Sequence, residues 1–390
     1  MKIGIDISQI VYEGTGVARF TSGLVDSILV NDKKNEWVFF FSSLRRNLDR
    51  SLEQKILSQG HKLIKRKLPA TLLSFLTNDI HNFFLSSKIY NLGSRIDFFI
   101  TSDWSEPLLS GVKKATVVHD LTCFRYPDTV DQKIRKTQEK RLQHVKKESQ
   151  IIFADSNATK KDLVELLNIQ EDRIVVNYPG VEVTKQSKNQ INKTLKKYNL
   201  EEKKFILTVG KLEPRKNLSR LFEAFKQLNN NTLQLIEVGP KGWGKSSNIK
   251  HLTSNINFLG FVPDDELYSL YTSCLFFVFP SIWEGFGYPI IEAMRSGAPV
   301  TCSNSSSIRE IAGDAALFFD PLNIENMYQS INRLIQDENL RKQLIKKGIQ
   351  RSKIFTWKKY YESIIYALMS FPRKRESREG NYMDSGSSPE

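Results

Sequence analysis

The sequence contains no uninterrupted apolar run of about eighteen residues, the length that a membrane-spanning helix requires. Its start, MKIGIDISQI, alternates apolar and polar residues and lacks the continuous apolar segment of a secretory signal, so we expect a cytoplasmic protein. Cysteine is also scarce. Cys123, Cys274 and Cys302 have no spacing typical of a metal site, and an odd number in a reducing compartment predicts free, buried thiols.

Acidic residues are outnumbered, with 43 Asp and Glu against 57 Lys and Arg, which gives a formal net charge of +14. Such an excess indicates an anionic partner, which is a nucleic acid, an acidic membrane surface or a phosphorylated substrate. Much of it lies in residues 45–68 and 133–147, and each stretch is interpreted either as a solvated helix face or as a contact with an anionic membrane. No nucleic-acid-binding motif accompanies the charge, so we expect no nucleic-acid partner.

Two sets of short, β-rich apolar runs alternate with segments of helical periodicity, which is typical of parallel sheets built from strand–helix–strand units. A chain of 390 residues is also longer than one hydrophobic core usually supports. We therefore predict an α/β protein with two Rossmann-like, doubly wound parallel-sheet domains. The predicted segments are a first domain over 1–183, a linker over 184–204, a second domain over 205–356, a helix over 357–371 that returns to the first domain, and a disordered tail over 372–390.

Ligands of such sheets bind beyond the carboxyl ends of the strands, where loops lead into helices. The first strand is followed by Gly14 and Gly16, which permit close approach of the backbone to an anion at a helix N-terminus. A two-glycine turn of this kind is equally compatible with a plain strand-to-helix connection. The imidazole of His119, at the end of another strand, is either a structural hydrogen-bonding group or a group at the ligand edge.

The second set of strands opens with a similar loop, VGKLEPRKNL, in which Gly210 is followed by three cations ahead of a helix. These cations are Lys211, Arg215 and Lys216. Cationic side chains next to free helix amides suit a diphosphate, although surface charge on a solvated turn is the simpler interpretation.

A third loop, WEGFGYPIIEAMRSGAPV, places seven residues between Glu284 and Glu292. Pro289 suits a first helical position, so we expect Glu284 in the loop and Glu292 in the first helical turn. A surface charge and a helix-dipole partner are the simplest roles for the two glutamates. Because the glycines of this loop leave amides uncovered, backbone donors and carboxylate acceptors can also grip the hydroxyl and phosphate groups of a nucleotide sugar.

These motifs together resemble the group 1, or family 4, glycosyltransferases, which are retaining enzymes of the two-domain GT-B type whose domains face each other across a cleft. The resemblance covers roughly residues 1–369 and is strongest over 205–321. It rests on the Glu–seven residues–Glu motif, the HD of VVHDLT, the VGxLEPRKNL loop and LIEVGPKGWG. The branch with EPRKN, GWG and WEGFGYP is similar to mannosyltransferases that build lipopolysaccharide O-chains from GDP-mannose.

The resemblance implies a role for each motif residue. Glu284 and the amides of Phe286 and Gly287 hold the donor sugar, while Glu292 binds the ribose hydroxyls. Arg215 and Lys216 face the diphosphate, and Gly16, preceded by Gly14, approaches it from the first domain. His119 contacts the sugar near the reacting centre. Lys211, after Gly210, occupies a position where many relatives have arginine. Lysine keeps the positive charge but cannot form the paired hydrogen bonds of a guanidinium.

Transfer with retention, no cofactor and no metal is therefore the implied chemistry, and the loops contain no Asp-x-Asp site. The implied partners are a nucleotide-sugar donor, with GDP-mannose favoured, and a glycan or lipid-linked acceptor at the inner face of the cell membrane. Two alternatives stay open at this point. One is a nucleotide-sugar epimerase on the same fold, and the other is a non-catalytic nucleotide-binding module recruited to a membrane.

Overall fold

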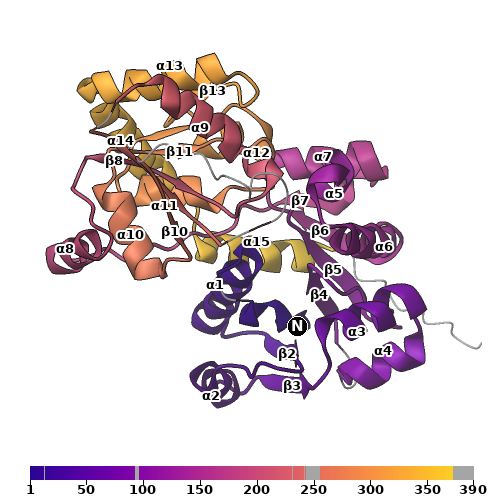
Figure 1. Cartoon of the computed structure of the whole chain (residues 1–390). Coiled ribbons are helices and arrows are strands. Elements are labelled where there is room, and N and C mark those ends of the chain that lie inside the picture. The colour runs from indigo at the N-terminus through magenta and orange to yellow at the C-terminus, as the bar shows by residue number, and fades with distance from the viewer. Residues whose placement is uncertain (13, 93–95, 231, 241, 243–254, 372–390) are drawn as a thin grey trace, which may run out of the picture.

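A computed structural model of the chain describes residues 1–12, 14–92, 96–230, 232–240, 242 and 255–371. Two parallel sheets organise these residues, one from the first half of the chain and one from the second (Figure 1). The predicted α/β architecture with two doubly wound parallel sheets is confirmed. The predicted tail over 372–390 lies outside the described residues.

The first sheet has seven strands in the order β3-β2-β1-β4-β5-β6-β7, and all of its strand pairs are parallel. The chain adds strands on one side of β1 and then crosses to the other side, so β1 and β4 flank a topological switch point. The strands are β1 (Lys2–Asp6), β2 (Glu36–Ser42), β3 (Lys62–Arg66), β4 (Phe98–Ser102), β5 (Lys113–Val118), β6 (Ser149–Ala154) and β7 (Ile174–Val176).

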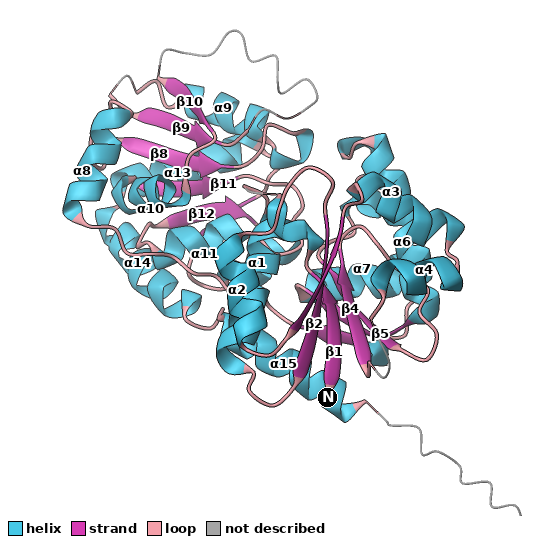
Figure 2. Ribbon diagram, turned by 90° about the horizontal axis from the view of Figure 1, so that it is seen from below, coloured by secondary structure: helices cyan, strands magenta, loops and turns pink. Residues whose placement is uncertain are grey.

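Helices cover both faces of the first sheet (Figure 2). The α-helices are α1 (Gly16–Asn31), α2 (Arg50–Ser58), α3 (Ala70–Ser74), α4 (Phe83–Tyr90), α5 (Thr122–Arg125), α6 (Gln132–Glu148) and α7 (Asn157–Leu167). A π-helical turn, η2 (Phe75–Ile80), joins α3 to α4, and short 3-10 turns are η1 (Ser8–Val11), η3 (Pro127–Thr129) and η4 (Glu171–Arg173). Because both faces are covered, a strand such as β2, with sequence EWVFFFS, is buried from its second residue onward.

The second sheet has six parallel strands in the order β10-β9-β8-β11-β12-β13 and repeats the same crossover around β8. Its strands are β8 (Phe205–Val209), β9 (Gln234–Val238), β10 (Ile256–Gly260), β11 (Phe276–Phe279), β12 (Val300–Ser303) and β13 (Leu317–Phe319). Its helical elements are η5 (Pro214–Lys216), α9 (Leu218–Gln227), α10 (Asp264–Ser273), α11 (Tyr288–Arg295), α12 (Ser306–Ala312), α13 (Ile324–Gln336) and α14 (Glu338–Ser352).

The last described helix, α15 (Trp357–Ser370), crosses back to the first sheet and packs against α1 (Figures 1 and 2). Its apolar face joins the core that contains the side chains of β1 and β2. Two glycines make room for the first residue of this helix, because a Cβ atom on Gly23 would lie 2.0 Å from the Trp357 ring and one on Gly180 would lie 2.3 Å from the Trp357 nitrogen. The C-terminal segment is thereby part of the first core.

Within the segment predicted as a linker, helix α8 (Lys188–Lys197) packs against α10 of the second half. The exact domain boundaries stay a prediction. Cys123, Cys274 and Cys302 are free and buried, as expected. Among the described residues, no helix is both long enough and apolar enough to cross a membrane.

Candidate active site

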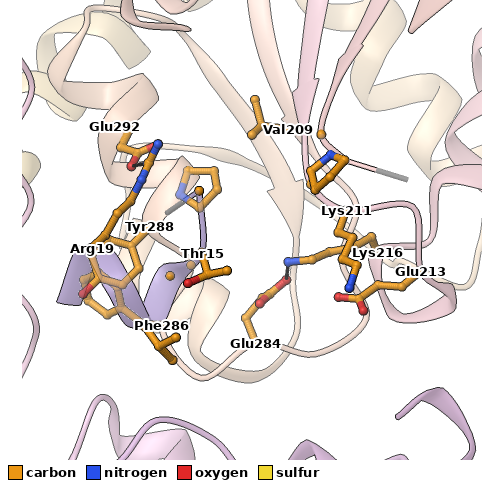
Figure 3. Close-up of a pocket in the computed structure, with 18 of the residues that line it drawn as sticks. Thr15, Arg19, Val209, Lys211, Glu213, Lys216, Glu284, Phe286, Tyr288 and Glu292 are labelled. Atoms are coloured by element: carbon orange, nitrogen blue, oxygen red, sulfur yellow. Dashed lines mark hydrogen bonds and ion pairs between the residues drawn. The ribbon is translucent and has the colours of Figure 1, made fainter. Parts of the chain in front are cut away.

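A cavity of about 690 Å³ lies between the two halves and is lined by residues from both (Figure 3). All of the predicted site residues line it: Gly14, Gly16, His119, Gly210, Lys211, Arg215, Lys216, Glu284, Phe286, Gly287 and Glu292. Their loops follow β1, β5, β8 and β11, so the carboxyl ends of strands from both sheets converge on one space. The structure thus brings the predicted residues together, while their individual roles stay predictions.

The loop after β1 approaches the second half closely at Gly14. This residue has φ of 77°, and a Cβ atom there would lie 2.9 Å from the ring of Phe261, so both its conformation and its surroundings favour glycine. Thr15 then caps helix α1 by accepting a hydrogen bond from the backbone N–H of Ala18 at 3.3 Å. The helix therefore begins at Gly16 with its N-terminal end at the cavity.

The carboxylate of Glu284 is held by the two cations of the loop after β8. Its Oε1 accepts a hydrogen bond from Lys216 Nζ at 2.6 Å (Figure 3). Its Oε2 accepts one from Arg215 Nη1, also at 2.6 Å. Arg215 also donates a hydrogen bond to the backbone carbonyl of Trp283 at 2.8 Å, and this second contact fixes the guanidinium against the loop that carries Glu284. These three side chains form one charge cluster on the cavity wall.

Opposite charges in this cluster control its ionisation. Burial raises the pKa of Glu284, but Arg215 and Lys216 outweigh it and bring the pKa down to about 2. Burial lowers the pKa of Lys216 against the pull of Glu284, whereas for Arg215 the pull of Glu284 and Asp120 exceeds the burial and raises the pKa. The carboxylate is thus ionised at neutral pH.

His119 follows β5 directly, and its ring is oriented by a carboxylate that directly follows the neighbouring strand, β6. His119 Nδ1 lies 2.7 Å from Asp155 Oδ2, and the ring packs edge-on against Phe20 with centroids 4.6 Å apart. Burial lowers the pKa of His119, but the carboxylates of Asp155 and Asp103 together raise it by more, so the net shift is upward. His119 Nε2 is buried and has no hydrogen-bond partner, which leaves one polar atom of this cavity-lining residue available to a ligand.

The loop of Glu284 touches the loop of His119 through glycine. A Cβ atom on Gly285 would lie 1.9 Å from the backbone oxygen of His119, so only glycine permits this contact between the two halves. Gly287, with φ of 97°, ends the loop in a left-handed conformation and caps α11. The short Gly-Phe-Gly turn therefore serves both close packing and backbone geometry.

Two positional expectations for this loop are wrong. Helix α11 begins at Tyr288, so Pro289 is its second residue, and its first turn contains no acidic residue. Glu292 lies one turn further along and is buried, with 2% of its surface exposed. Gly287, with its positive φ, is the N-cap, so the helix begins one residue before the expected start at Pro289. The side chain of Glu292 points inward and contacts Arg19 across the cavity, so it does not act as a partner of the helix dipole.

Glu292 binds an arginine that sequence reasoning did not select. Arg19 on α1 donates from Nη1 to Glu292 (Figure 3). It also donates from Nη2 to Asp264 on α10, so one guanidinium joins the two halves. Tyr271 adds a hydrogen bond from its hydroxyl to Glu292 Oε2 at 3.2 Å. Burial raises the pKa of Glu292, and Arg19 opposes this increase.

Asp155 is the second functional candidate that sequence reasoning missed. It directly follows β6, the strand that pairs with β5, so strand adjacency was the signal that could have placed it beside His119. For Arg19 the available signal was weaker, since its position on α1 indicates only that it lies near the glycine loop.

Histidine and carboxylate side chains that could share a metal ion occur together once among the described residues. This group is His81, His144 and Glu148, which lie on η2, α6 and the residues beside them. None of the three lines the cavity between the halves. The cavity instead presents cations next to carboxylates.

Comparison with known proteins agrees with this arrangement. Residues 190–351 match the family described as "Glycosyl transferases group 1". O-antigen chain mannosyltransferase B of Escherichia coli is 29% identical over 378 residues, which cover 92% of this chain and 96% of that protein. O-antigen chain mannosyltransferase RfbU of Salmonella typhimurium is 26% identical over 266 residues, covering 66% of this chain and 70% of that protein.

The fold has solved counterparts as well. The crystal structure of HepE from Anabaena in complex with UDP and glucose superposes with a TM-score of 0.70 at 17% identity, covering 95% of this chain and 100% of that one. The chain therefore carries a group 1 glycosyltransferase domain on a GT-B fold, as the resemblance of its motifs implied.

Proposed function

We propose that this protein is a glycosyltransferase that transfers a hexose, with mannose favoured, from a nucleotide-diphosphate sugar to a glycan or lipid-linked acceptor in cell-surface polysaccharide synthesis. The observation that carries the proposal is the ionised Glu284 carboxylate, fixed between Arg215 and Lys216 on a cavity wall that touches the His119 loop. The names of the two O-antigen mannosyltransferase relatives support mannose, and hence GDP-mannose, as the favoured donor.

In the proposed complex, the cations after β8 face the donor diphosphate. Arg215 and Lys216 supply fixed positive charge, and Lys211 and the backbone at Gly210 line the same wall. The amide groups of the 286–287 turn and the carboxylate of Glu284 hold the sugar, while Glu292 accepts hydrogen bonds from the ribose. Gly14 and Gly16 bring the N-terminal end of α1 to the phosphates from the other half.

The proposed chemistry is a metal-independent transfer that retains the anomeric configuration, as in family 4. The bond between the anomeric carbon and the phosphate oxygen breaks, and the acceptor oxygen bonds to the same face of that carbon. The acceptor proton passes to the departing phosphate oxygen. Arg215 and Lys216 stabilise the negative charge that grows on the phosphate, and Glu284 stabilises the positive charge that grows on the sugar ring. The buried His119 Nε2 is available to bond a sugar hydroxyl.

The direct test is turnover with purified protein. GDP-mannose, UDP-sugars and a lipid-linked glycan acceptor are supplied, and free nucleotide and extended acceptor are measured. The expected result is acceptor extension with GDP-mannose and an α-linkage by NMR. Sugar epimerisation without acceptor extension, or nucleotide binding without any turnover, would contradict the proposal.

His119 gives this test an internal control. His119→Gln removes the imidazole that lines the cavity, and we expect turnover to fall by a factor of about 10² or more. His61→Gln removes an imidazole of the same half that does not line this cavity, and turnover should stay near the wild-type value. Equal activity of the two variants would show that His119 has no role in the reaction.

We further propose that the protein binds the inner face of the cell membrane peripherally. Of the two basic stretches, 133–147 forms most of α6, where Lys133, Lys136, Lys140 and Lys147 are exposed at helical spacing. The contacting element η2 begins with Phe75 and ends with Ile80, which are 49% and 48% exposed. Exposed cations beside exposed apolar side chains suit an anionic lipid surface, with roughly 1 kcal/mol from each near-surface cation.

Co-sedimentation with vesicles tests this surface. Binding to vesicles with anionic lipid at low salt, and release at high salt, is expected. Replacing Lys133 and Lys136 by Gln should weaken the binding, whereas the same replacement of Lys342 and Lys346 on α14 of the other half serves as the control. No binding to anionic vesicles, or equal loss in both double variants, would contradict the membrane proposal.

A further inference from the structure

Arg19 makes an unusual bridge across the cavity. It is the fourth residue of α1 in the first half, and its guanidinium contacts the carboxylate of Glu292 on α11 in the second half (Figure 3). The same guanidinium contacts the carboxylate of Asp264 on α10. The two partners differ in exposure, since the side chain of Asp264 is 54% exposed and that of Glu292 only 3%. The arginine therefore spans from a buried carboxylate to the solvent.

Of the two carboxylates, the buried Glu292 depends more strongly on a compensating cation. A carboxylate removed from water is stable as an anion only when a cation or strong donors compensate it. Glu292 Oε1 accepts a hydrogen bond from Arg19 Nη1, and Oε2 accepts one from the hydroxyl of Tyr271 at 3.2 Å. Among its described contacts, Arg19 is thus the cation that compensates Glu292.

From this geometry we propose that Arg19 is a positioning residue for the donor: it keeps the Glu292 carboxylate ionised and fixed at the cavity wall so that the carboxylate can accept the ribose hydroxyls. The inference rests on the proposed function, which gives Glu292 its ribose role. It adds that a residue of the first half prepares the nucleotide site of the second half. Nucleotide affinity is then tied to the contact between the two halves.

The second partner explains why arginine suits this position. A guanidinium can donate two separate hydrogen bonds in a fixed plane, whereas the ammonium of lysine is a point charge on a flexible stem. Asp264 holds Nη2 while Nη1 stays on Glu292. The exposed Asp264 thereby anchors the guanidinium and limits the orientations that the Arg19 side chain can adopt.

Loss of Arg19 has a signature that a direct donor contact does not have. Burial already raises the pKa of Glu292, and the positive charge of Arg19 opposes the shift, so removing Arg19 raises that pKa further. The protonated carboxyl is a weaker acceptor, hence nucleotide affinity should fall at lower pH and recover as pH rises. The titratable groups that face Glu292 are Arg19 on α1, Asp264, Tyr268 and Tyr271 on α10, and Tyr288 on α11.

Calorimetric titration with GDP, and with UDP in parallel, tests the inference between about pH 6 and about pH 8. Arg19→Met keeps the length of the side chain and removes its charge. We expect its affinity relative to wild type to decrease toward lower pH, by up to a factor of about ten per pH unit, and to approach the wild-type value toward higher pH, because one pH unit changes the protonation ratio of a carboxyl group tenfold. Arg19→Lys should show a smaller shift of the same kind.

Arg135→Met is the matched control, because it removes an arginine paired with Glu139 on the surface of α6. Its affinity profile should equal that of wild type. Circular dichroism and thermal unfolding establish that each variant is folded. An unchanged profile in Arg19→Met would overturn the inference, and an equal loss at every pH would also overturn it by showing a direct contact with the nucleotide.

The failure of the proposed function looks different. If wild-type protein binds neither nucleotide, or if Glu292→Gln binds as tightly as wild type across the range, then the ribose role of Glu292 is wrong whatever Arg19 does. If wild type binds, Glu292→Gln binds weakly and Arg19→Met matches wild type, then the proposed function stands and the role of Arg19 does not.

Discussion

Replacing Glu284 by Gln tests the charge cluster most sharply. Burial raises the pKa of Glu284, but Arg215 and Lys216 lower it to about 2 from an ordinary value of 4.5. At about 1.4 kcal/mol for each pKa unit, this difference corresponds to about 3 kcal/mol of folding free energy. The glutamine keeps the size of the side chain but leaves two partly buried cations without their carboxylate.

The pH dependence follows from the direction of the shift. Because the pKa of Glu284 is lower in the folded state, its stabilisation is complete above the unfolded-state value of about 4.5 and disappears as pH falls toward about 2. At pH 7, urea unfolding should show Glu284→Gln to be less stable than wild type by about 3 kcal/mol. This difference in unfolding free energy should decrease as the pH falls from about 4.5 to about 2. Glu338→Gln, which alters an exposed pair with Lys342, should leave stability nearly unchanged.

Nucleotide binding adds a second measurement on the same variant. A diphosphate supplies negative charge to Arg215 and Lys216, so GDP should raise the unfolding temperature of Glu284→Gln by more than that of wild type. Turnover should nevertheless fall by about 10²–10³, because the charge that stabilises the sugar ring is gone. Wild-type stability at pH 7 would refute the assignment of a stabilising charge cluster, and wild-type turnover would refute the role of Glu284 in the reaction.

Three further predictions concern the leaving group, metal dependence and the C-terminal helix. Lys216→Ala should lower turnover more than it raises the donor Michaelis constant, since phosphate charge grows toward the transition state; steady-state kinetics showing only a raised Michaelis constant would make Lys216 a ground-state binder. Activity should survive a chelator because cationic side chains face the proposed diphosphate, and loss with recovery on added magnesium or manganese would contradict this. Gly23→Ala should cost about 1–3 kcal/mol in urea unfolding because its Cβ meets Trp357, whereas Gly16→Ala, with open space around it, should unfold like wild type.

The sequence was sufficient to predict the architecture. Apolar runs such as WVFFFS and LFFVFP alternate with amphipathic segments, and this local pattern requires two parallel sheets covered by helices. It was also sufficient to identify the loops that line the cavity, because a parallel sheet brings the carboxyl ends of its strands to one edge, but not the cavity residues Arg19 and Asp155. The loops that begin at Gly210 and Glu284 therefore had to lie near each other, whatever the details of packing.

Only the tertiary structure decided which charges pair. Arg19 and Glu292 are separated by 273 positions, and their contact depends on how the two halves meet, which no local pattern encodes. The same is true of Gly285 against the His119 carbonyl and of Gly23 and Gly180 against Trp357, where the absence of a side chain has meaning only once the neighbour is known. Periodicity and spacing specify faces and edges, whereas the partner of a buried charge is set by the packing of distant elements.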